Sequence, residues 1–387
     1  MQNWSPNSWQ HYSNAQPINY EVNSELQAVL VSLGKASPLV EIAQIESLRK
    51  LLGDVAKQKA FILQAGECAE RFVDAQPQRV QAQATLLNEL SDLLAQQLKK
   101  PMITIGRIAG QYAKPRTLAF ETRDGMELPN YRGDLINALE FNAAARRANP
   151  ERLLMAYESA KQALNLLASC APQLYTSHEV LHLPFEQSLT RRVADNYYNT
   201  ATHFPWVGVR TAYFDSAHIE YVSGLINPVA VKLGNQCDAA ALQALIYKLN
   251  PRAELGRLSL IHRLGTTEIA KTLPKLIKAA QETAIPVLWI CDPMHGNTQH
   301  KANRKLRILS AMRDELQQAL QIHHDLGSHL SGLHLELTSD AVNECVADLE
   351  APFVGNPSYV VDPRLNRTQA QELLGGLSSS YLQAINK

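Results

Sequence analysis

The chain has 387 residues, of which 45% are hydrophobic and 19% charged, a composition typical of a globular protein with a large core. Its 37 Lys and Arg residues balance 37 Asp and Glu residues, which argues against a protein that binds nucleic acid over its whole surface. This length allows one large α/β barrel or two ordinary domains.

Targeting and redox signals are weak in this chain. The N-terminal sequence MQNWSPNSWQ is polar and lacks the basic and apolar regions of a secretory signal. No apolar run approaches the roughly 20 residues that span a bilayer. The five cysteines are odd in number and show no Cys-x-x-Cys spacing, which argues against disulfides and zinc ribbons. We therefore expect a cytoplasmic protein that binds no membrane.

Residues 1–59 precede the first predicted strand. They begin as coil rich in Trp and Pro and continue with helical patterns from Glu25 to Leu33 and from Val40 to Leu52. We expect this segment to be an extension packed on a catalytic barrel formed by residues 60–387.

Short β-type runs then alternate with helical patterns. The eight predicted strands are AFILQAG from Ala60, MITIGRI from Met102, LYTSHEV from Leu174, WVGVRT from Trp206, VAVKLG from Val229, RLSLIHRLG from Arg257, VLWICD from Val287 and GLHLEL from Gly332. A (β/α)₈ barrel accommodates this count directly. The alternative is a doubly wound sheet, but QAGEC at residues 64–68 is not the glycine-rich turn expected there. Residues 109–137, after the second strand, form a long loop of the kind that is usually functional.

Charged residues follow several predicted strands. Arg107, Arg210, Lys232 and Arg263 lie at the ends of strands two, four, five and six. In a barrel these ends converge on one face. Four cations on one face predict a site for a phosphate or carboxylate. A lysine among cations should have a lowered pKa, so Lys232 is suited to proton transfer.

A metal site is predicted beside these cations. Cys68, His295 and Glu336 lie at the ends of strands one, seven and eight, which are neighbours in a closed barrel, and Asp362 follows in a later loop. One thiolate, one imidazole and two carboxylates suit Mn²⁺, Co²⁺, Fe²⁺ or Zn²⁺. Such an ion would act as a Lewis acid on a carbonyl oxygen of a phosphorylated substrate.

The sequence resembles the class II (plant-type) 3-deoxy-D-arabino-heptulosonate 7-phosphate (DAHP) synthases from Trp4 to about Leu373. The matching blocks are QAGECAE (64–70), GRIAGQYAKPR (106–116), YRGD (131–134), TSHE (176–179), PWVGVRT (205–211), NPVAVKLG (227–234), DPMHGNT (292–298), GLHLELT (332–338) and DPRLN (362–366). The resemblance implies a (β/α)₈ barrel, and an enzyme that condenses phosphoenolpyruvate with erythrose 4-phosphate and releases phosphate.

The resemblance also implies site residues. The metal ligands would be Cys68, His295, Glu336 and Asp362, with Mn²⁺ the expected ion. The phosphoenolpyruvate contacts would be Arg107, Trp206, Arg210, Lys232 and Arg263, and the sugar-phosphate contacts Lys114, Arg116 and Thr117. Lys232, Arg210 and His295 would be the catalytic residues. We expect a homo-oligomer, either a dimer or a tetramer.

Several blocks depart from the family pattern. Gly208-Val209-Arg210-Thr211 replaces GERT, so the chain lacks a Glu that the family is thought to use near the attacking water. His262-Arg263-Leu264-Gly265 replaces SRMG, and NPVA replaces NPxG, as in short members from phenazine-type secondary metabolism. The segment from Tyr131 to Leu174 is short where housekeeping members carry helices that bind aromatic amino acids, so we expect no feedback inhibition.

Two alternatives to this function stay open. One is the same chemistry with another aldehyde, such as an amino- or imino-tetrose phosphate. The other is a weakly catalytic paralogue that acts through a partner enzyme such as chorismate mutase.

Overall fold

The computed structural model describes residues 4–301, 304–348, 352–355 and 360–377. Its centre is an eight-stranded sheet with the order β5-β2-β1-β14-β11-β10-β9-β8, in which all pairs are parallel. The strands are β1 (Phe61–Gly66), β2 (Met102–Arg107), β5 (Tyr175–Thr176), β8 (Trp206–Val207), β9 (Val229–Leu233), β10 (Leu258–His262), β11 (Leu288–Cys291) and β14 (Leu330–Glu336). Seven of the eight predicted runs contain one of these strands, and the eighth, from Gly332, overlaps β14, which begins two residues earlier.

The two edge strands of the sheet meet, so the barrel closes. Glu179 and Trp206 form a parallel bridge just beyond β5. The Trp206 N–H donates to the His178 carbonyl at 3.1 Å, and the Val180 N–H donates to the Trp206 carbonyl at 3.0 Å. The predicted (β/α)₈ barrel is therefore confirmed.

Strands three and four are shorter than predicted. After β5, the Glu179 N–H donates to the Gln111 side chain at 2.9 Å instead of to a strand. After β8, the Thr211 N–H donates to the Gly208 carbonyl at 3.0 Å, which turns the chain. Both strands therefore end early, in polar turns that face the barrel mouth.

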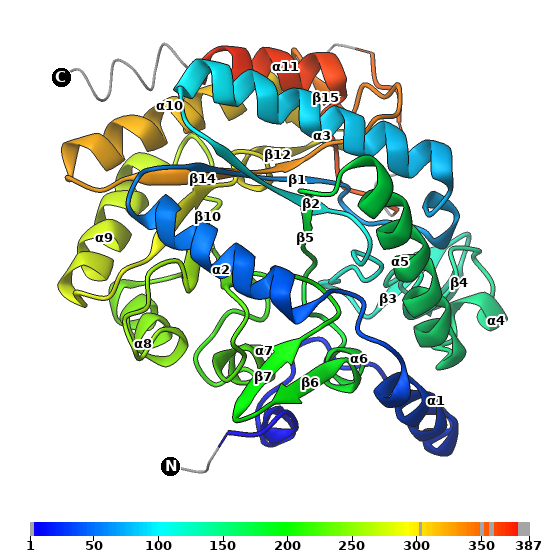
Figure 1. The fold of residues 1–387 in the computed structure, drawn as a ribbon. Coiled ribbons are helices and arrows are strands. Elements are labelled where there is room, and N and C mark those ends of the chain that lie inside the picture. The colour runs from blue at the N-terminus through cyan, green and yellow to red at the C-terminus, as the bar shows by residue number, and fades with distance from the viewer. Residues whose placement is uncertain (1–3, 302–303, 349–351, 356–359, 378–387) are drawn as a thin grey trace.

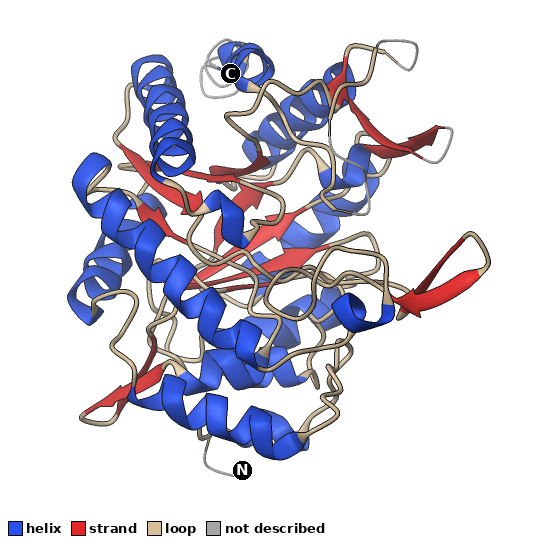
Figure 2. Ribbon diagram, turned by 90° about the vertical axis from the view of Figure 1, so that its right-hand side faces the viewer, coloured by secondary structure: helices blue, strands red, loops and turns tan. Residues whose placement is uncertain are grey.

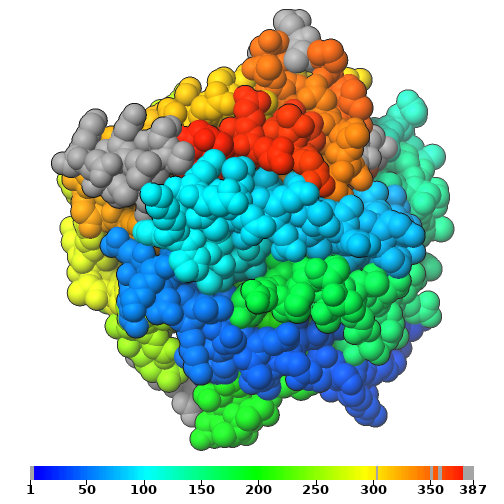
Figure 3. Space-filling view, turned by 45° about the horizontal axis from the view of Figure 1, so that its top comes forward, coloured from blue at the N-terminus to red at the C-terminus, as the bar shows by residue number. Residues whose placement is uncertain are grey.

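Helices surround the barrel (Figure 1). They are α1 (Asn23–Lys35), α2 (Ile42–Ala56), α3 (Pro77–Leu98), α4 (Ala143–Arg146), α5 (Glu151–Cys170), α6 (Leu183–Ser188), α7 (Ala217–Ser223), α8 (Ala239–Leu249), α9 (Ile269–Glu282), α10 (Leu309–Asp325) and α11 (Arg367–Gly375), with 3₁₀ turns at Ser8–His11, Phe72–Asp74 and His295–Asn297. Side chains cap several of them: Ser216 accepts the Ile219 N–H and Asp238 accepts the Ala241 N–H. In Figure 3, α11 lies directly beside α3, and Arg367 pairs with Glu89 across them.

The core has two apolar layers. The outer one lies between the strands and helices such as α3, α9 and α10. The inner one fills the N-terminal end of the barrel, where Leu48, Leu52 and Val55 of α2 pack against strand residues such as Ile62 and Ile290. In Figure 1, α2 crosses the front of the barrel. The N-terminal mouth is thus closed by apolar side chains, and the opposite mouth carries the polar ones.

Short antiparallel hairpins extend from this frame at its periphery (Figure 2). β3 (Phe120–Arg123) pairs with β4 (Met126–Pro129), inside the predicted long loop. β6 (Thr190–Val193) pairs with β7 (Asn196–Asn199). β12 (Thr298–Lys301) pairs with β13 (Arg304–Ile308), which also pairs with β15 (Cys345–Val346). Within the described residues, none of the helices has both the length and the apolar character needed to cross a membrane.

Candidate active site

A cavity of about 250 Å³ lies at the C-terminal ends of the barrel strands. All twelve residues predicted for the site line it: Cys68, Arg107, Lys114, Arg116, Thr117, Trp206, Arg210, Lys232, Arg263, His295, Glu336 and Asp362. The fold therefore brings together side chains that are almost 300 residues apart in the sequence.

Lys232 lies at the centre of the cationic side of this cavity. It is 3% exposed, and its Nζ is 2.8 Å from Asp292 Oδ2 and 4.7 Å from the centre of the Trp206 ring. The pKa of Lys232 is lowered, as predicted, but burial is the largest cause and the cation Arg107 a smaller one. A buried ammonium with one carboxylate partner is well placed to give up a proton.

The other three cations differ in their environments. Arg107 is buried and already satisfied, because it donates to the Glu67 and Cys68 carbonyls at 2.8 and 2.9 Å and pairs with Glu336 at 3.0 Å. Arg263 is half-buried, and Arg210 is exposed and donates to Thr117 Oγ1 at 3.1 Å. A buried ring of cations was expected to need an anionic ligand, but protein carboxylates already compensate its buried members.

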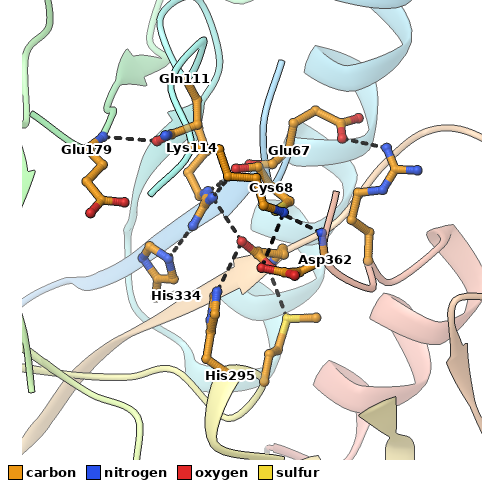
Figure 4. A network of polar contacts seen from close by, with 12 residues as sticks. Glu67, Cys68, Gln111, Lys114, Glu179, His295, His334 and Asp362 are labelled. Carbon is orange, nitrogen blue, oxygen red and sulfur yellow. Dashed lines mark hydrogen bonds and ion pairs between the residues drawn. The ribbon is translucent and has the colours of Figure 1, made fainter. Parts of the chain in front are cut away.

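An acidic cluster with one thiol faces the cations. Ligand atoms of Cys68, Glu336 and Asp362 all lie within 4.8 Å of one another. His295 joins them through Nε2, which is 3.2 Å from Glu336 Oε1. Figure 4 shows Cys68, His295 and Asp362 gathered there, with Lys114 alongside. Three of the four predicted metal ligands therefore form one cluster in the cavity wall, and His295 adjoins it through Glu336.

Basic side chains hold both carboxyl groups of this cluster ionised. Glu336 pairs with Arg307 at 2.8 Å as well as with Arg107, and these cations and His295 keep its pKa well below the ordinary value despite burial. Asp362 pairs with Lys305 at 2.6 Å and with Lys114 at 3.4 Å, and its pKa is also lowered. The cluster therefore supplies two carboxylates at neutral pH.

The donor atoms of this cluster fit a divalent ion of borderline softness. Cys68 Sγ accepts the Asp362 N–H at 3.2 Å and faces Lys114 Nζ at 3.5 Å, two contacts that favour the thiolate but do not outweigh its burial. Burial raises the pKa of this thiol to about 11, and a bound cation would reverse that shift. His295 Nδ1 lies 2.7 Å from Asp292 Oδ2, a contact of the kind that orients a ligating imidazole.

The loop after β2 is held in place by Glu70. Its carboxylate accepts the backbone N–H groups of Ala109, Gly110 and Gln111 at 2.9, 2.9 and 2.7 Å. Burial nevertheless raises its pKa to about 7. This anchor directs the following residues, including Lys114, into the cavity.

Arg364, two residues after Asp362 in the sequence, positions the loop that carries Asp362. Arg364 pairs with Glu67 at 2.7 Å and with Glu344 at 2.8 Å, and all three residues are buried. This network fixes the loop that carries Asp362 against the residue preceding Cys68. In the DPRLN block (362–366), Asp362 is therefore the predicted metal ligand and Arg364 has a structural role.

Sequence reasoning missed several residues that line the cavity. Lys305 and Arg307 come from β13, and Gln111 and Glu179 come from the turns after β2 and β5. The sequence RKLRI, in which basic and apolar residues are mixed as in a partly exposed strand, could have predicted β13. Glu179 stands next to His178, which is a core residue: its Nε2 contacts Glu186 at 2.8 Å.

Glu179, from the matching block TSHE, packs against the segment where the chain departs from the family pattern. The Glu179 carboxyl group packs directly against Gly208: a Cβ atom there would lie 2.0 Å from Glu179 Oε1, so a larger residue would displace the carboxyl group. Burial raises the pKa of Glu179 to about 7, although Lys232 and Arg210 lower it. Val209 also lines the cavity. A carboxyl group from the turn after β5 therefore lies against Gly208, the residue before Val209.

Comparison with known proteins agrees with this arrangement. The model of the class-II DAHP synthetase family matches residues 4–173 and 170–377. Proteins named phospho-2-dehydro-3-deoxyheptonate aldolase from Neurospora crassa and Streptomyces coelicolor are 35% and 34% identical, over 98% and 97% of this chain and 95% and 97% of their own lengths. One of that name from Mycolicibacterium smegmatis is 32% identical, over 90% of this chain and 88% of its own. The chain therefore belongs to the class-II DAHP synthetase family and is an enzyme of that family.

Proposed function

We propose that this cavity condenses phosphoenolpyruvate with erythrose 4-phosphate, giving DAHP and inorganic phosphate. The supporting observation is that fixed cations and an acid–thiol cluster line one cavity in a chain of this family. Both substrates are phosphorylated, and phosphoenolpyruvate also carries a carboxylate. Arginine and lysine are the side chains best suited to hold such groups.

Phosphoenolpyruvate fits the deeper part of the cavity, near Lys232, Arg107 and Trp206. The Trp206 Nε1–H is buried without a hydrogen-bond acceptor in the described part of the chain. A buried donor without an acceptor is costly, so this group is a candidate contact for a substrate oxygen. Arg263 and Arg210 complete the set from the more open side.

Erythrose 4-phosphate fits the outer part, along the loop after β2. Lys114, Arg116 and Thr117 follow one another there, and Thr117 already contacts Arg210. The two substrates would thus share Arg210 at their boundary. This arrangement orients the aldehyde toward the enol carbon and removes much of the entropic cost of bringing the two together.

Cys68, His295, Glu336 and Asp362 would hold the divalent metal, and Mn²⁺ is the ion we propose. When bound, the ion would polarise the aldehyde carbonyl of erythrose phosphate. Lys114 and Lys305 would then be released from Asp362 to face the substrates. Lys232 would move a proton at its Nζ, between the substrates and Asp292.

Glu179 is our candidate for the proton acceptor from the attacking water. Its carboxyl group lies in the cavity, and its pKa of about 7 allows it to take up a proton at neutral pH. Water would add to the carbon that bears the phosphate ester, and phosphate would then leave. Glu179 would thus supply a carboxyl group to the cavity, which Val209 lines without one.

Phosphate release from phosphoenolpyruvate, measured with Mn²⁺ and with or without erythrose 4-phosphate, tests the reaction. We expect release only with both substrates and the metal. Metal-loaded, folded protein that releases none contradicts the proposal. Cys68→Ser should lower metal affinity and activity together, and Cys345→Ser, a buried thiol outside the cluster, serves as the control. Unchanged metal content in Cys68→Ser would contradict the ligand set.

We also propose a role in secondary metabolism without feedback inhibition. The alignment with the Neurospora relative spans 457 positions although this chain has 387 residues, so the relative carries additional segments. The two matched segments of the family model meet at residues 170–173, near the end of α5. Phe, Tyr and Trp should therefore leave the rate unchanged; strong inhibition by any of them contradicts this view.

The remaining expectations are proposals of the same kind. They are a homo-oligomer, a cytoplasmic location, and a division into an extension (1–59) and a barrel (60–387). Size-exclusion chromatography with light scattering tests the first, and a monomer at micromolar concentration contradicts it.

The presence of Val209 in place of the family Glu favours a second candidate function, in which the enzyme carries out the same condensation with an amino- or imino-tetrose phosphate. The ratio of kcat/KM for erythrose 4-phosphate and for the amino analogue decides between the two substrates. A ratio above one supports erythrose 4-phosphate.

A further inference from the structure

A second cluster of metal-binding side chains lies outside the cavity. Ligand atoms of His262, Cys291 and Glu315 are all within 4.8 Å of one another, and all three residues are fully buried. His262 and Cys291 are register partners on the neighbouring strands β10 and β11, and Glu315 reaches them from α10. Cys291 belongs to the apolar layer between the sheet and the helices, so the cluster lies behind the barrel wall.

His262 has an environment that calls for a ligand. Neither of its ring nitrogens has a hydrogen-bond partner among the described residues, although the side chain is completely buried. Buried polar atoms without partners are rare in folded proteins, and a bound ion commonly accounts for such an atom. In this chain His262 also stands where the family pattern has Ser.

Glu315 is held with its carboxyl group toward this cluster. Oε1 accepts the N–H groups of Leu264 and Gly265 at 3.1 and 3.0 Å, and Oε2 accepts from Asn297 at 2.7 Å. No Lys or Arg within the described residues forms an ion pair with it. Burial raises the pKa of Glu315 to about 7 and that of Cys291 well above its ordinary value, as expected for acids without a nearby cation.

We propose that His262, Cys291 and Glu315 bind one Zn²⁺ ion behind the sheet. A thiolate and a carboxylate would neutralise its two charges, and the neutral imidazole would supply the third donor. Ligands at the usual Zn distances of about 2.0–2.3 Å lie roughly 3.3–3.8 Å apart in a tetrahedral site, so small side-chain rotations suffice. A water would take the fourth position.

The ion would tie β10, β11 and α10 together. Glu315 also holds the backbone directly after Arg263, which lines the catalytic cavity. The Zn²⁺ site would therefore stiffen the rim that carries this substrate-binding arginine. Because the site is closed, the ion would enter during folding.

Cobalt tests this site separately from the catalytic one. In full-length Cys68→Ser, the cavity has lost its thiol, so any cobalt–thiolate charge-transfer band must come from another cysteine. Cys68→Ser protein would be treated with a chelator, refolded with Co²⁺ and desalted. We expect it to show this band and to retain one Co²⁺ bound at the His262, Cys291 and Glu315 cluster. Adding Cys291→Ser should remove the band, and adding Cys345→Ser, another fully buried thiol, should keep it.

A Cys68→Ser protein without the band overturns the proposal, as does a band that survives Cys291→Ser. If the variant with Cys291→Ser does not fold, His262→Gln in the Cys68→Ser background tests the site instead, because this variant keeps every thiol except that of Cys68. We expect it to weaken Co²⁺ binding at least tenfold; unchanged binding contradicts the site. None of these outcomes depends on whether the cavity catalyses the condensation.

Discussion

The described part of the chain contains two clusters of Cys, His and carboxylate side chains, and their surroundings differ. At the cavity, Arg107, Arg307, Lys114 and Lys305 pair with the carboxylates, whose pKa values fall. Behind the sheet, Glu315 is held by N–H groups alone and its pKa rises to about 7. Ligand type therefore does not decide the charge state of a site; the neighbouring cations do.

This difference has a functional consequence. A cavity whose carboxylates already have cationic partners gains less from an added cation, so it should release the ion to solvent more readily. A closed cluster without cations gains much more from an ion and should retain it. The following experiments disturb one cluster or its neighbours and leave the other intact.

The largest effect should follow from Lys232→Met, which removes the buried cation between Trp206 and Asp292. We expect kcat/KM to fall about 10³-fold, because the variant loses both a charge contact and a proton carrier. Phosphate release measures this, with Lys278→Met at an exposed position of helix α9 as the control. A loss below tenfold would show that Lys232 does not contact the reacting groups.

Glu179→Gln should lower kcat about 10²-fold, within the range of lost acid–base catalysis. The wild-type rate should rise as the pH increases through about 7, because the carboxylate form accepts the proton. The variant should lose this rising limb. A pH–rate profile of the same shape in both proteins contradicts the assignment.

Glu315→Ala should lower the free energy of unfolding by about 2–3 kcal/mol, because three buried donors lose their acceptor. Glu315→Gln keeps most of these contacts and should lose less. Urea titrations of chelator-treated protein measure both. Equal stability of the Ala variant and the wild type contradicts this role.

The same urea titrations, repeated at several pH values, should show that Glu315 and Glu336 change the free energy of unfolding with pH in opposite directions. The folded pKa of Glu315, about 7, exceeds the ordinary value, so its contribution declines as the pH rises from about 4.3 to about 7. The folded pKa of Glu336 is lowered, so its contribution is full above about 4.3 and declines as the pH falls below that. Glu315→Gln should flatten only the first region.

The barrel strands and the residues at their ends could be predicted from the sequence, because burial and barrel geometry leave a pattern in it. β1, β9 and β11 are buried along their whole length and read as largely apolar runs. Strand ends of a barrel converge by geometry, so the residues at the strand ends could be placed together: Cys68, Arg107, Arg210, Lys232, Arg263, His295 and Glu336. Lys114, Arg116, Thr117 and Trp206 came only from the family resemblance. The hairpin β12–β13 gives no apolar run, because its residues are largely exposed, so Lys305 and Arg307 were missed. Likewise, only the three-dimensional packing of Gly208 against Glu179 shows which carboxyl group stands beside Val209.

The smallest effect should come from Val209→Glu. If Glu179 already accepts the proton, the added carboxyl group should change kcat by less than about tenfold, and repulsion between the two carboxylates should shift the rising limb of the pH–rate profile upward. In the Glu179→Gln background the same substitution should restore part of the lost rate, because it returns a carboxyl group to the cavity. Val209→Gln, which adds the same bulk without the charge, is the control. A large gain from Val209→Glu in the wild type would instead mean that Glu179 is not the proton acceptor.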